Sequence, residues 1–107
     1  MKVAYIAHPF NGNLKNAKDA ERIILRLIKD HPDFTFYSPL HNTGFFYFVM
    51  DYDTGMKHCF EMLRRCDELW LCTGWKDSKG CNLEIAFARE HKIPVYILEE
   101  SWTLKPF

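Results

Sequence analysis

Residues 68–92, ELWLCTGWKDSKGCNLEIAFAREHK, contain three kinds of pattern in succession. Glu68–Thr73 is a short apolar run that predicts a buried strand, and Gly74–Gly80 has the Gly, Asp and Ser residues of a turn. Cys81–Lys92 follows as a predicted helix, which ends before Pro94. A strand, a turn and a helix in this order favour an α/β fold, in which helices cover a parallel sheet.

The same alternation continues toward both ends of the chain. Lys2–Ala7 and Phe34–Tyr37 are predicted strands, and Leu14–Asp30 between them has its apolar residues at helical spacing. The remaining predicted elements are a long loop at Leu40–Asp53, a helix capped by Asp53 or Thr54, and a strand at Val95–Leu98. We therefore expect one flavodoxin-like or Rossmann-like three-layer domain spanning residues 1–107, with parallel sheet order 2-1-3-4 and a possible short fifth strand.

Composition excludes several classes of partner. Lys and Arg number 14 and so do Asp and Glu, so no basic excess predicts binding to a nucleic acid polymer. No stretch approaches transmembrane length, and the apolar run at the N-terminus is too short for a signal peptide. The cysteines and histidines lack metal-ligand spacing, so we expect free thiols in the cytoplasm, with no metal, other cofactor or membrane partner.

The predicted topology indicates where a ligand binds. Ligands of open parallel sheets bind beyond the carboxyl ends of the strands, where the strand order reverses. The loops at His8–Asn13 and Gly74–Gly80 meet at that point in the order 2-1-3-4. Ser78 and Gly80, beside the free N–H groups of a helix start, suit a phosphate or a sugar hydroxyl. An ordinary turn with a helix cap explains the same two residues equally well.

Two polar side chains lie in predicted apolar surroundings. Glu84 has apolar neighbours near the start of its helix, and burying a carboxylate is costly unless it is paired or used. We expect a nucleophile that the helix dipole keeps ionised; the alternative is an exposed glutamate that complements the dipole. Tyr5 lies in an otherwise apolar strand, so its hydroxyl needs a partner unless it is simply a core aromatic.

Further candidates lie in and near the same two loops. Pro9 and Asn11 are predicted to line the site, and His8 either contacts an anion or only ends its strand. Trp75 either stacks on a nucleobase or packs as a lid. Phe45–Phe48 either covers the cleft or forms a contact between subunits.

Three motifs together resemble the nucleoside 2-deoxyribosyltransferase-like superfamily, and the likeness extends from Val3 to about Leu98. The motifs are Tyr5-Ile6-Ala7-x-Pro9-Phe10, Cys66-Asp67-Glu68-Leu69 and Gly74-Trp75-x-x-Ser78-x-Gly80-x-x-x-Glu84-x-x-x-Ala88. That superfamily includes nucleoside 5′-monophosphate N-glycosidases and many small phage and bacterial proteins.

The resemblance implies a role for each matching residue. Glu84 matches the nucleophile that attacks the anomeric carbon, and Tyr5 matches the tyrosine that positions this carboxylate. Ser78 matches the residue at the 5′ end of the nucleoside, where enzymes of free nucleosides have an acid and enzymes of 5′-monophosphates have a serine. Homodimers or higher homo-oligomers are implied as well, because related sites are completed across a subunit interface.

One position departs from the family pattern. Members commonly carry an aspartate eight residues before the position of Asp67, where it holds or protonates the leaving base; here this residue is Cys59. A thiol is a poor proton donor near neutral pH, and Asp51 or Asp53 could substitute from the preceding loop. The tail that reaches a neighbouring subunit in typical members is also reduced to a few residues here.

Three functional hypotheses follow. The first is a nucleotide-binding N-glycosidase or deoxyribosyltransferase that acts on a nucleoside 5′-monophosphate through a glutamate nucleophile. The alternative is a non-catalytic protein that senses or sequesters a nucleotide such as an ADP-ribose derivative. A third is an interaction protein that uses Phe45–Phe48 as its contact. The sequence leaves hydrolysis, transfer and the identity of the nucleotide open.

Overall fold

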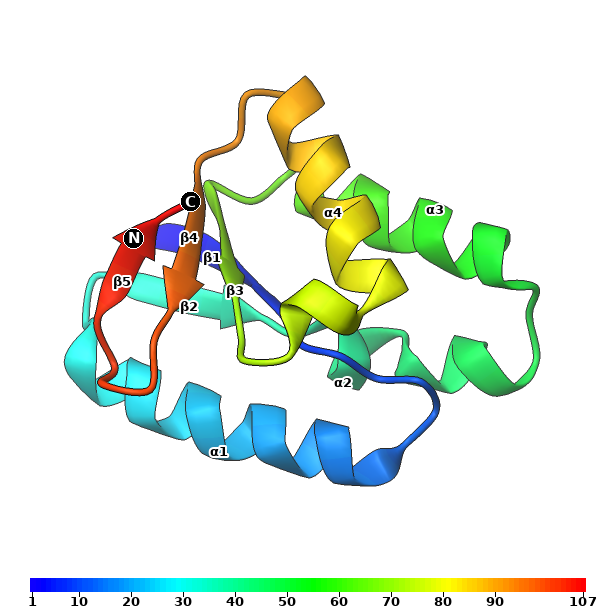
Figure 1. Cartoon of the computed structure of the whole chain (residues 1–107), viewed down its shortest axis with the longest axis horizontal. Coiled ribbons are helices and arrows are strands. Elements are labelled where there is room, and N and C mark those ends of the chain that lie inside the picture. The colour runs from blue at the N-terminus through cyan, green and yellow to red at the C-terminus, as the bar shows by residue number, and fades with distance from the viewer.

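A five-stranded sheet forms the centre of the computed structural model, which describes residues 1–107 (Figure 1). Its order is β2-β1-β3-β4-β5, and the strands are β1 (Lys2–Ala7), β2 (Phe34–Tyr37), β3 (Glu68–Leu71), β4 (Val95–Leu98) and β5 (Leu104–Pro106). The first four strands are parallel, whereas β5 pairs antiparallel with β4. The predicted α/β fold, its strand order and the short fifth strand are therefore confirmed.

Helices cover both faces of this sheet (Figure 1). They are α1 (Leu14–Asp30), α2 (Pro39–Asn42), α3 (Tyr52–Leu63) and α4 (Lys79–Glu90), with short 3-10 helices η1 (Gly44–Phe48) and η2 (Trp75–Asp77). Strand β1 sends alternate side chains to the two faces, as its geometry requires. Tyr5 and Ala7 pack with residues of α3 and α4, and Ala4 and Ile6 pack with residues of α1. The molecule thus has three layers with two apolar cores.

Two helices begin at other residues than the sequence predicts. Helix α3 has Asp51 as its cap in place of Asp53 or Thr54, because the Asp51 carboxylate accepts hydrogen bonds from the N–H and the hydroxyl of Thr54. Helix α4 begins at Lys79 and not at Cys81, with Ser78 as its cap. Glu84 is therefore the sixth residue of its helix and lies in the second turn.

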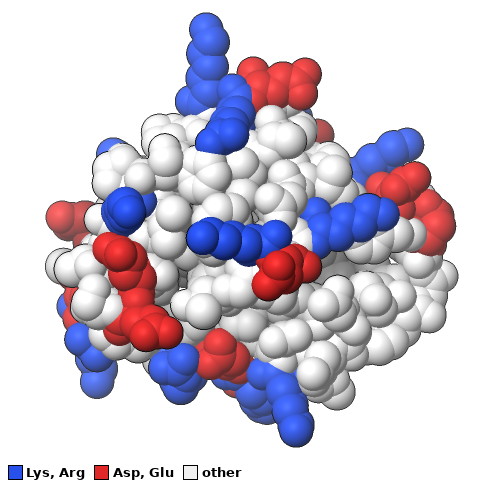
Figure 2. Space-filling view, viewed as in Figure 1, with Lys and Arg blue, Asp and Glu red and all other residues white.

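The predicted loop at Leu40–Asp53 contains more structure than expected, namely the end of α2, all of η1 and the start of α3. Its aromatic residues leave part of the surface apolar. Phe45, Phe48 and Val49 are exposed, and Figure 2 shows an area without charged side chains at the lower right. Elsewhere on the face in Figure 2, side chains of both signs are interspersed.

The longest helix is α1, with 17 residues, and no helix has both the length and the apolar character needed to cross a membrane.

Candidate active site

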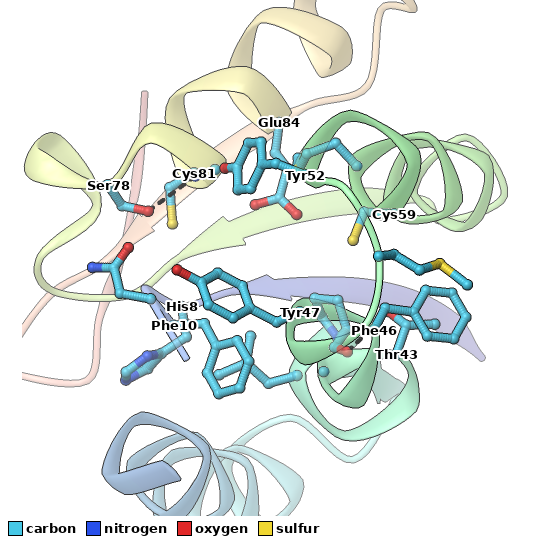
Figure 3. Close-up of a pocket in the computed structure, with 18 of the residues that line it drawn as sticks. His8, Phe10, Thr43, Phe46, Tyr47, Tyr52, Cys59, Ser78, Cys81 and Glu84 are labelled. Atoms are coloured by element: carbon cyan, nitrogen blue, oxygen red, sulfur yellow. Dashed lines mark hydrogen bonds between the residues drawn. The ribbon is translucent and has the colours of Figure 1, made fainter. Parts of the chain in front are cut away.

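A cavity of about 350 Å³ lies near the carboxyl ends of β1 and β3. Its walls come from the β1–α1 loop, the segment from α2 to the start of α3, and the start of α4 (Figure 3). The volume is in the range of small-molecule pockets. Five of the residues predicted from the sequence line it, namely His8, Asn11, Ser78, Gly80 and Glu84.

Glu84 is almost fully buried, with 5% of its surface exposed. The hydroxyl of Tyr5, itself fully buried, donates a hydrogen bond to Oε2 of Glu84. The other carboxylate oxygen makes no hydrogen bond within the protein, and Glu84 lines the cavity, so this oxygen is open to a ligand. One carboxylate oxygen of Glu84 is thus bonded to Tyr5, and the other faces the cavity.

Burial governs the protonation of this pair. It raises the pKa of Glu84 from the usual 4.5 to about 7, while the hydrogen bond from Tyr5 acts in the opposite direction. Burial, followed by the charge of Glu84, raises the pKa of Tyr5 well above its usual value, so Tyr5 stays a donor. The sequence predicts that the helix dipole keeps Glu84 ionised. In the structure the carboxylate lies in the second helical turn and is desolvated, which raises its pKa.

Ser78 and the start of α4 supply hydrogen-bond donors at one end of the cavity. The Ser78 side chain is buried, and its Oγ accepts a hydrogen bond from the Cys81 N–H at 3.1 Å. The N–H groups of Lys79 and Gly80 begin the helix and have no acceptor within it. A Cβ on Gly80 would lie 3.0 Å from the hydroxyl oxygen of Tyr52, so glycine keeps this end open. These donors form an environment suited to an anion.

Asn82 holds the loop before this helix and was not predicted from the sequence. Its side-chain amide donates to the carbonyl oxygens of Trp75, Lys76 and Ser78, at 3.0, 3.1 and 2.8 Å. An Asn four residues after a Ser N-cap is the only signal that the sequence carries for this contact.

His8 is buried between two acceptors. Its Nδ1 lies 2.8 Å from the carbonyl oxygen of Pro9, and its Nε2 lies 2.7 Å from Oδ2 of Asp19. The same contact lowers the pKa of Asp19. His8 is therefore held at both ring nitrogens, on the side of the cavity that also holds Ser78 (Figure 3).

Aromatic and sulfur-containing side chains line much of the remaining wall. Phe46, Tyr47 and Met50 come from η1 and the residues that follow it, and Phe10 packs edge-on against Tyr47 at 5.5 Å between ring centroids. Phe45 and Phe48 do not line the cavity and are exposed, and Tyr47 and Met50 line it while also being partly open to solvent. The sequence predicts that Phe45–Phe48 either covers the cleft or forms a subunit contact. In the structure Phe46 and Tyr47 line the cavity, whereas Phe45 and Phe48 lie on the outer surface.

Cys59 lines the cavity next to the Tyr5–Glu84 pair. Burial and the charge of Glu84 raise the pKa of its thiol, whereas the hydroxyls of Tyr5 and Thr43 act against this. Of the two aspartates expected as substitutes, only Asp51 lines the cavity. Its bonds from Thr54 lower its pKa, so Asp51 is an anion and not a proton donor at neutral pH.

Three predicted site residues, Tyr5, Trp75 and Pro9, do not line this cavity. Tyr5 reaches the site through its hydrogen bond to Glu84, whereas Trp75 and Pro9 pack against other residues. Trp75 lies in η2, where its ring packs edge-on against Phe107 with 5.2 Å between centroids. Pro9 packs against Gly74, at which a Cβ would lie 3.2 Å from the Pro9 ring. Gly74 also has a φ of +95°, which favours glycine. Both residues therefore support the loops around the cavity.

Comparisons with known proteins agree with this architecture. Residues 1–97 match the family model "Domain of unknown function (DUF4406)". A solved 2-desoxiribosyltransferase from Leishmania mexicana is 15% identical, with a TM-score of 0.64 over 100% of this chain and 80% of that one. A 2-deoxyribosyltransferase from Bacillus psychrosaccharolyticus is 20% identical, with a TM-score of 0.61 over 89% of this chain and 70% of that one. No curated protein matched the chain. The structural matches show that the fold is that of the 2-deoxyribosyltransferases.

Proposed function

The chain belongs to the DUF4406 family, and we propose that it binds a nucleoside 5′-monophosphate and cleaves or transfers its N-glycosidic bond with Glu84 as the nucleophile. One observation carries this proposal above the others. A buried carboxylate has one oxygen bonded to Tyr5 and the other open to a cavity of nucleotide size. Two solved proteins of the same fold are named as 2-deoxyribosyltransferases, which supports glycosyl transfer as the reaction class.

The proposed chemistry follows from the hydrogen-bonded pair of Tyr5 and Glu84. The open oxygen of Glu84 attacks C1′ of the sugar, the C1′–N bond breaks, and an ester joins the sugar to the protein. Tyr5 keeps the other oxygen in place during this step. Water, or a second base, then attacks C1′ from the opposite face and releases Glu84, so the sugar keeps its configuration. Water gives hydrolysis and a second base gives transfer.

The 5′-phosphate is assigned to the end of the cavity that holds Ser78. The first N–H groups of α4 and the Ser78 hydroxyl suit phosphate oxygens. The Lys79 ammonium lies 4.8 Å over the Tyr52 ring and adds a cation beside this end. A carboxylate at position 78 would repel phosphate, so the serine favours a monophosphate over a nucleoside.

A second candidate function is nucleotide binding without turnover. The neutral Cys59 thiol faces the position at which an acid would assist departure of the base, and this observation favours a sensor or a sequestering protein. Such a protein would use the same phosphate end and hold the glycosidic bond intact. An ADP-ribose-like ligand is the expected class in that case.

Release of free base distinguishes the two functions. The protein is incubated with a panel of ribo- and deoxyribonucleoside monophosphates, and chromatography follows the bases. We expect base release that Glu84→Gln abolishes and that Glu90→Gln, an exposed change on the same helix, leaves intact. Tight binding without release would support the sensor. An absence of binding to any nucleotide would overturn both functions.

A further inference from the structure

Departure of the base poses a charge problem in this cavity. When the C1′–N bond breaks, its electron pair moves to the ring nitrogen of the base. A neutral base then leaves as an anion unless an acid protonates it, and such assistance is worth roughly 100-fold or more in rate. The side chains around the leaving base therefore decide which bases can depart.

Contacts along the cavity place that base. At one end, Ser78 is bonded to the backbone of Cys81. Farther along, Cys59 lies beside Glu84 and Thr43. The Phe46 N–H donates to the Thr43 carbonyl oxygen at the other end. Figure 3 shows the same order from Ser78 through Glu84 to Cys59 and Phe46. A nucleotide with its phosphate at Ser78 and C1′ at Glu84 therefore has its base against Cys59, Thr43 and Phe46.

The groups at that position are poor acids at neutral pH. The pKa of the Cys59 thiol is raised by burial, and the Thr43 hydroxyl donates to the carbonyl oxygen of Pro39. Asp51 is held as an anion by Thr54, and burial raises the pKa of Tyr52. The remaining titratable side chains on the cavity have other contacts or roles. His8 is bonded to its two acceptors, Tyr47 packs against Phe10, burial raises the pKa of Cys81 to about 12, and Glu84 is the nucleophile.

We propose that the preferred substrates are nucleotides whose base carries a positive charge at the glycosidic nitrogen, such as N-ribosylpyridinium nucleotides. The electron pair of the broken bond neutralises this charge, so the base leaves as a neutral molecule and needs no acid. This inference rests on the proposed function, because it takes Glu84 as the nucleophile and Ser78 as the phosphate end.

The charges around the cavity suit such a substrate. A cationic ring against Cys59, Thr43 and Phe46 would lie beside the carboxylate of Glu84 and the aromatic ring of Phe46, both of which attract cations. Its charge would also favour the ionised form of Glu84 that attack requires. The other end of the cavity, to which the phosphate is assigned, has the first N–H groups of α4 and lies beside the Lys79 ammonium.

The full reaction balances without a co-reactant other than water. A Glu84 oxygen bonds to C1′ as the C1′–N pair returns to the ring nitrogen. Water then attacks C1′, the ester bond to Glu84 breaks, and the carboxylate reforms. One water proton stays on the new sugar hydroxyl and the other passes to solvent, so each turnover releases one proton.

The test compares substrates that differ in charge at the glycosidic nitrogen. The cationic probe is nicotinamide mononucleotide, its control is the reduced dihydronicotinamide mononucleotide of nearly the same shape, and AMP, GMP, CMP and UMP represent neutral bases. We expect kcat/KM for the cationic probe to exceed that for the neutral bases by about 100-fold or more, with no cleavage of the reduced form. Glu84→Gln should abolish release of nicotinamide.

Two other outcomes of this comparison would contradict the inference. Cleavage of neutral-base nucleotides as fast as the pyridinium nucleotide would overturn this inference and leave the proposed function standing. Cleavage of neither class would overturn both.

A substitution at Cys59 gives a second, independent measurement. Cys59→Asp supplies an acid beside the leaving base, and we expect the preference for the cationic probe to fall by about tenfold or more. Cys59→Ser, which adds no useful acid, should keep the wild-type ratio. If Cys59→Asp folds and the ratio of kcat/KM between the cationic probe and the neutral bases is unchanged, the inference is contradicted. If this variant does not fold, the comparison of substrates on the wild-type chain still tests the inference.

Discussion

The hydroxyl of Tyr5 donates a hydrogen bond to Oε2 of Glu84 across 79 positions of sequence, and both residues are buried. The bond joins strand β1 to helix α4 beneath the floor of the cavity. Tyr5 stabilises the ionised carboxylate while burial destabilises it, and burial is the larger effect. The balance sets the pKa of Glu84 near neutral pH.

Replacing Tyr5 with phenylalanine should change the pH dependence of the proposed base release. The variant removes a hydrogen bond that lowers the pKa of Glu84, so this pKa should rise above about 7. A nucleophile must be ionised, and kcat/KM should therefore begin to fall at a higher pH than in the wild type as the solution is acidified. A pH–rate profile measures this, with circular dichroism as the check on folding. Superimposable profiles of variant and wild type would contradict the role given to Tyr5.

Replacing Glu84 with glutamine should stabilise the fold at neutral and higher pH. The pKa of the folded state is about 7 against a usual 4.5, so the folded chain binds this proton more tightly than the unfolded chain. Wild-type stability then falls as the pH rises from about 4.5 to about 7, and glutamine avoids a loss of about 3 kcal/mol. Urea unfolding at pH 5 and pH 8 should show a larger gain at pH 8. Glu90→Gln serves as the exposed control, and an equal gain at both pH values would argue against a desolvated carboxylate.

Two substitutions at Ser78 separate its cap from its effect on the ligand. Ser78→Ala loses the hydrogen bond to the Cys81 N–H, which costs about 1 kcal/mol of stability. Ser78→Asp keeps a capping oxygen but introduces a negative charge at the proposed phosphate end. We expect the aspartate variant to fold at least as stably as the alanine variant and to bind nucleoside monophosphates more weakly. Titration with AMP and adenosine checks this, and an unchanged ratio of the two affinities would refute the placement of the phosphate.

Gly12 and Gly55 offer a matched pair of glycine substitutions. Gly12 has a φ of +70°, and a Cβ there would lie 2.7 Å from a ring carbon of Tyr47. Gly12→Ala should therefore destabilise the fold by about 1–3 kcal/mol and shift the Tyr47 wall of the cavity. Gly55 lies in α3, and a Cβ there would meet no other atom within 4 Å, so Gly55→Ala should add about 0.5–1 kcal/mol of stability. Thermal unfolding of both variants measures the two opposite effects.

Much of the fold could be predicted from local signals. The bounds of β1, α1, β2 and β4 agree with the prediction to the residue, because each element has a clear period and a Pro, Asn or Gly at its limits. The starts of α3 and α4 could not be predicted as well. Asp51, Asp53 and Thr54 are all able to cap a helix, and only the bonds made in the folded chain select Asp51.

The candidate site also has residues that the sequence predicts and residues that it does not. Tyr5 and Glu84 stand out as polar residues within apolar runs, and strand order brings them together. The direction of each aromatic side chain between Phe45 and Phe48 depends on the short helix η1, whose sequence has no period to predict it. Trp75 is close to the site in sequence, but η2 orients its ring toward Phe107, and this contact involves a distant part of the chain.

The β1–α1 loop is held at several points before any ligand arrives. The Asn13 N–H and the Asn16 side chain both donate to the Phe10 carbonyl oxygen, and His8 is tied to Asp19 on α1. The conformational entropy of this wall is therefore lost during folding and does not oppose binding. The proposed nucleotide would meet a preorganised wall on this side, so calorimetry should show a binding entropy without a large contribution from loop ordering.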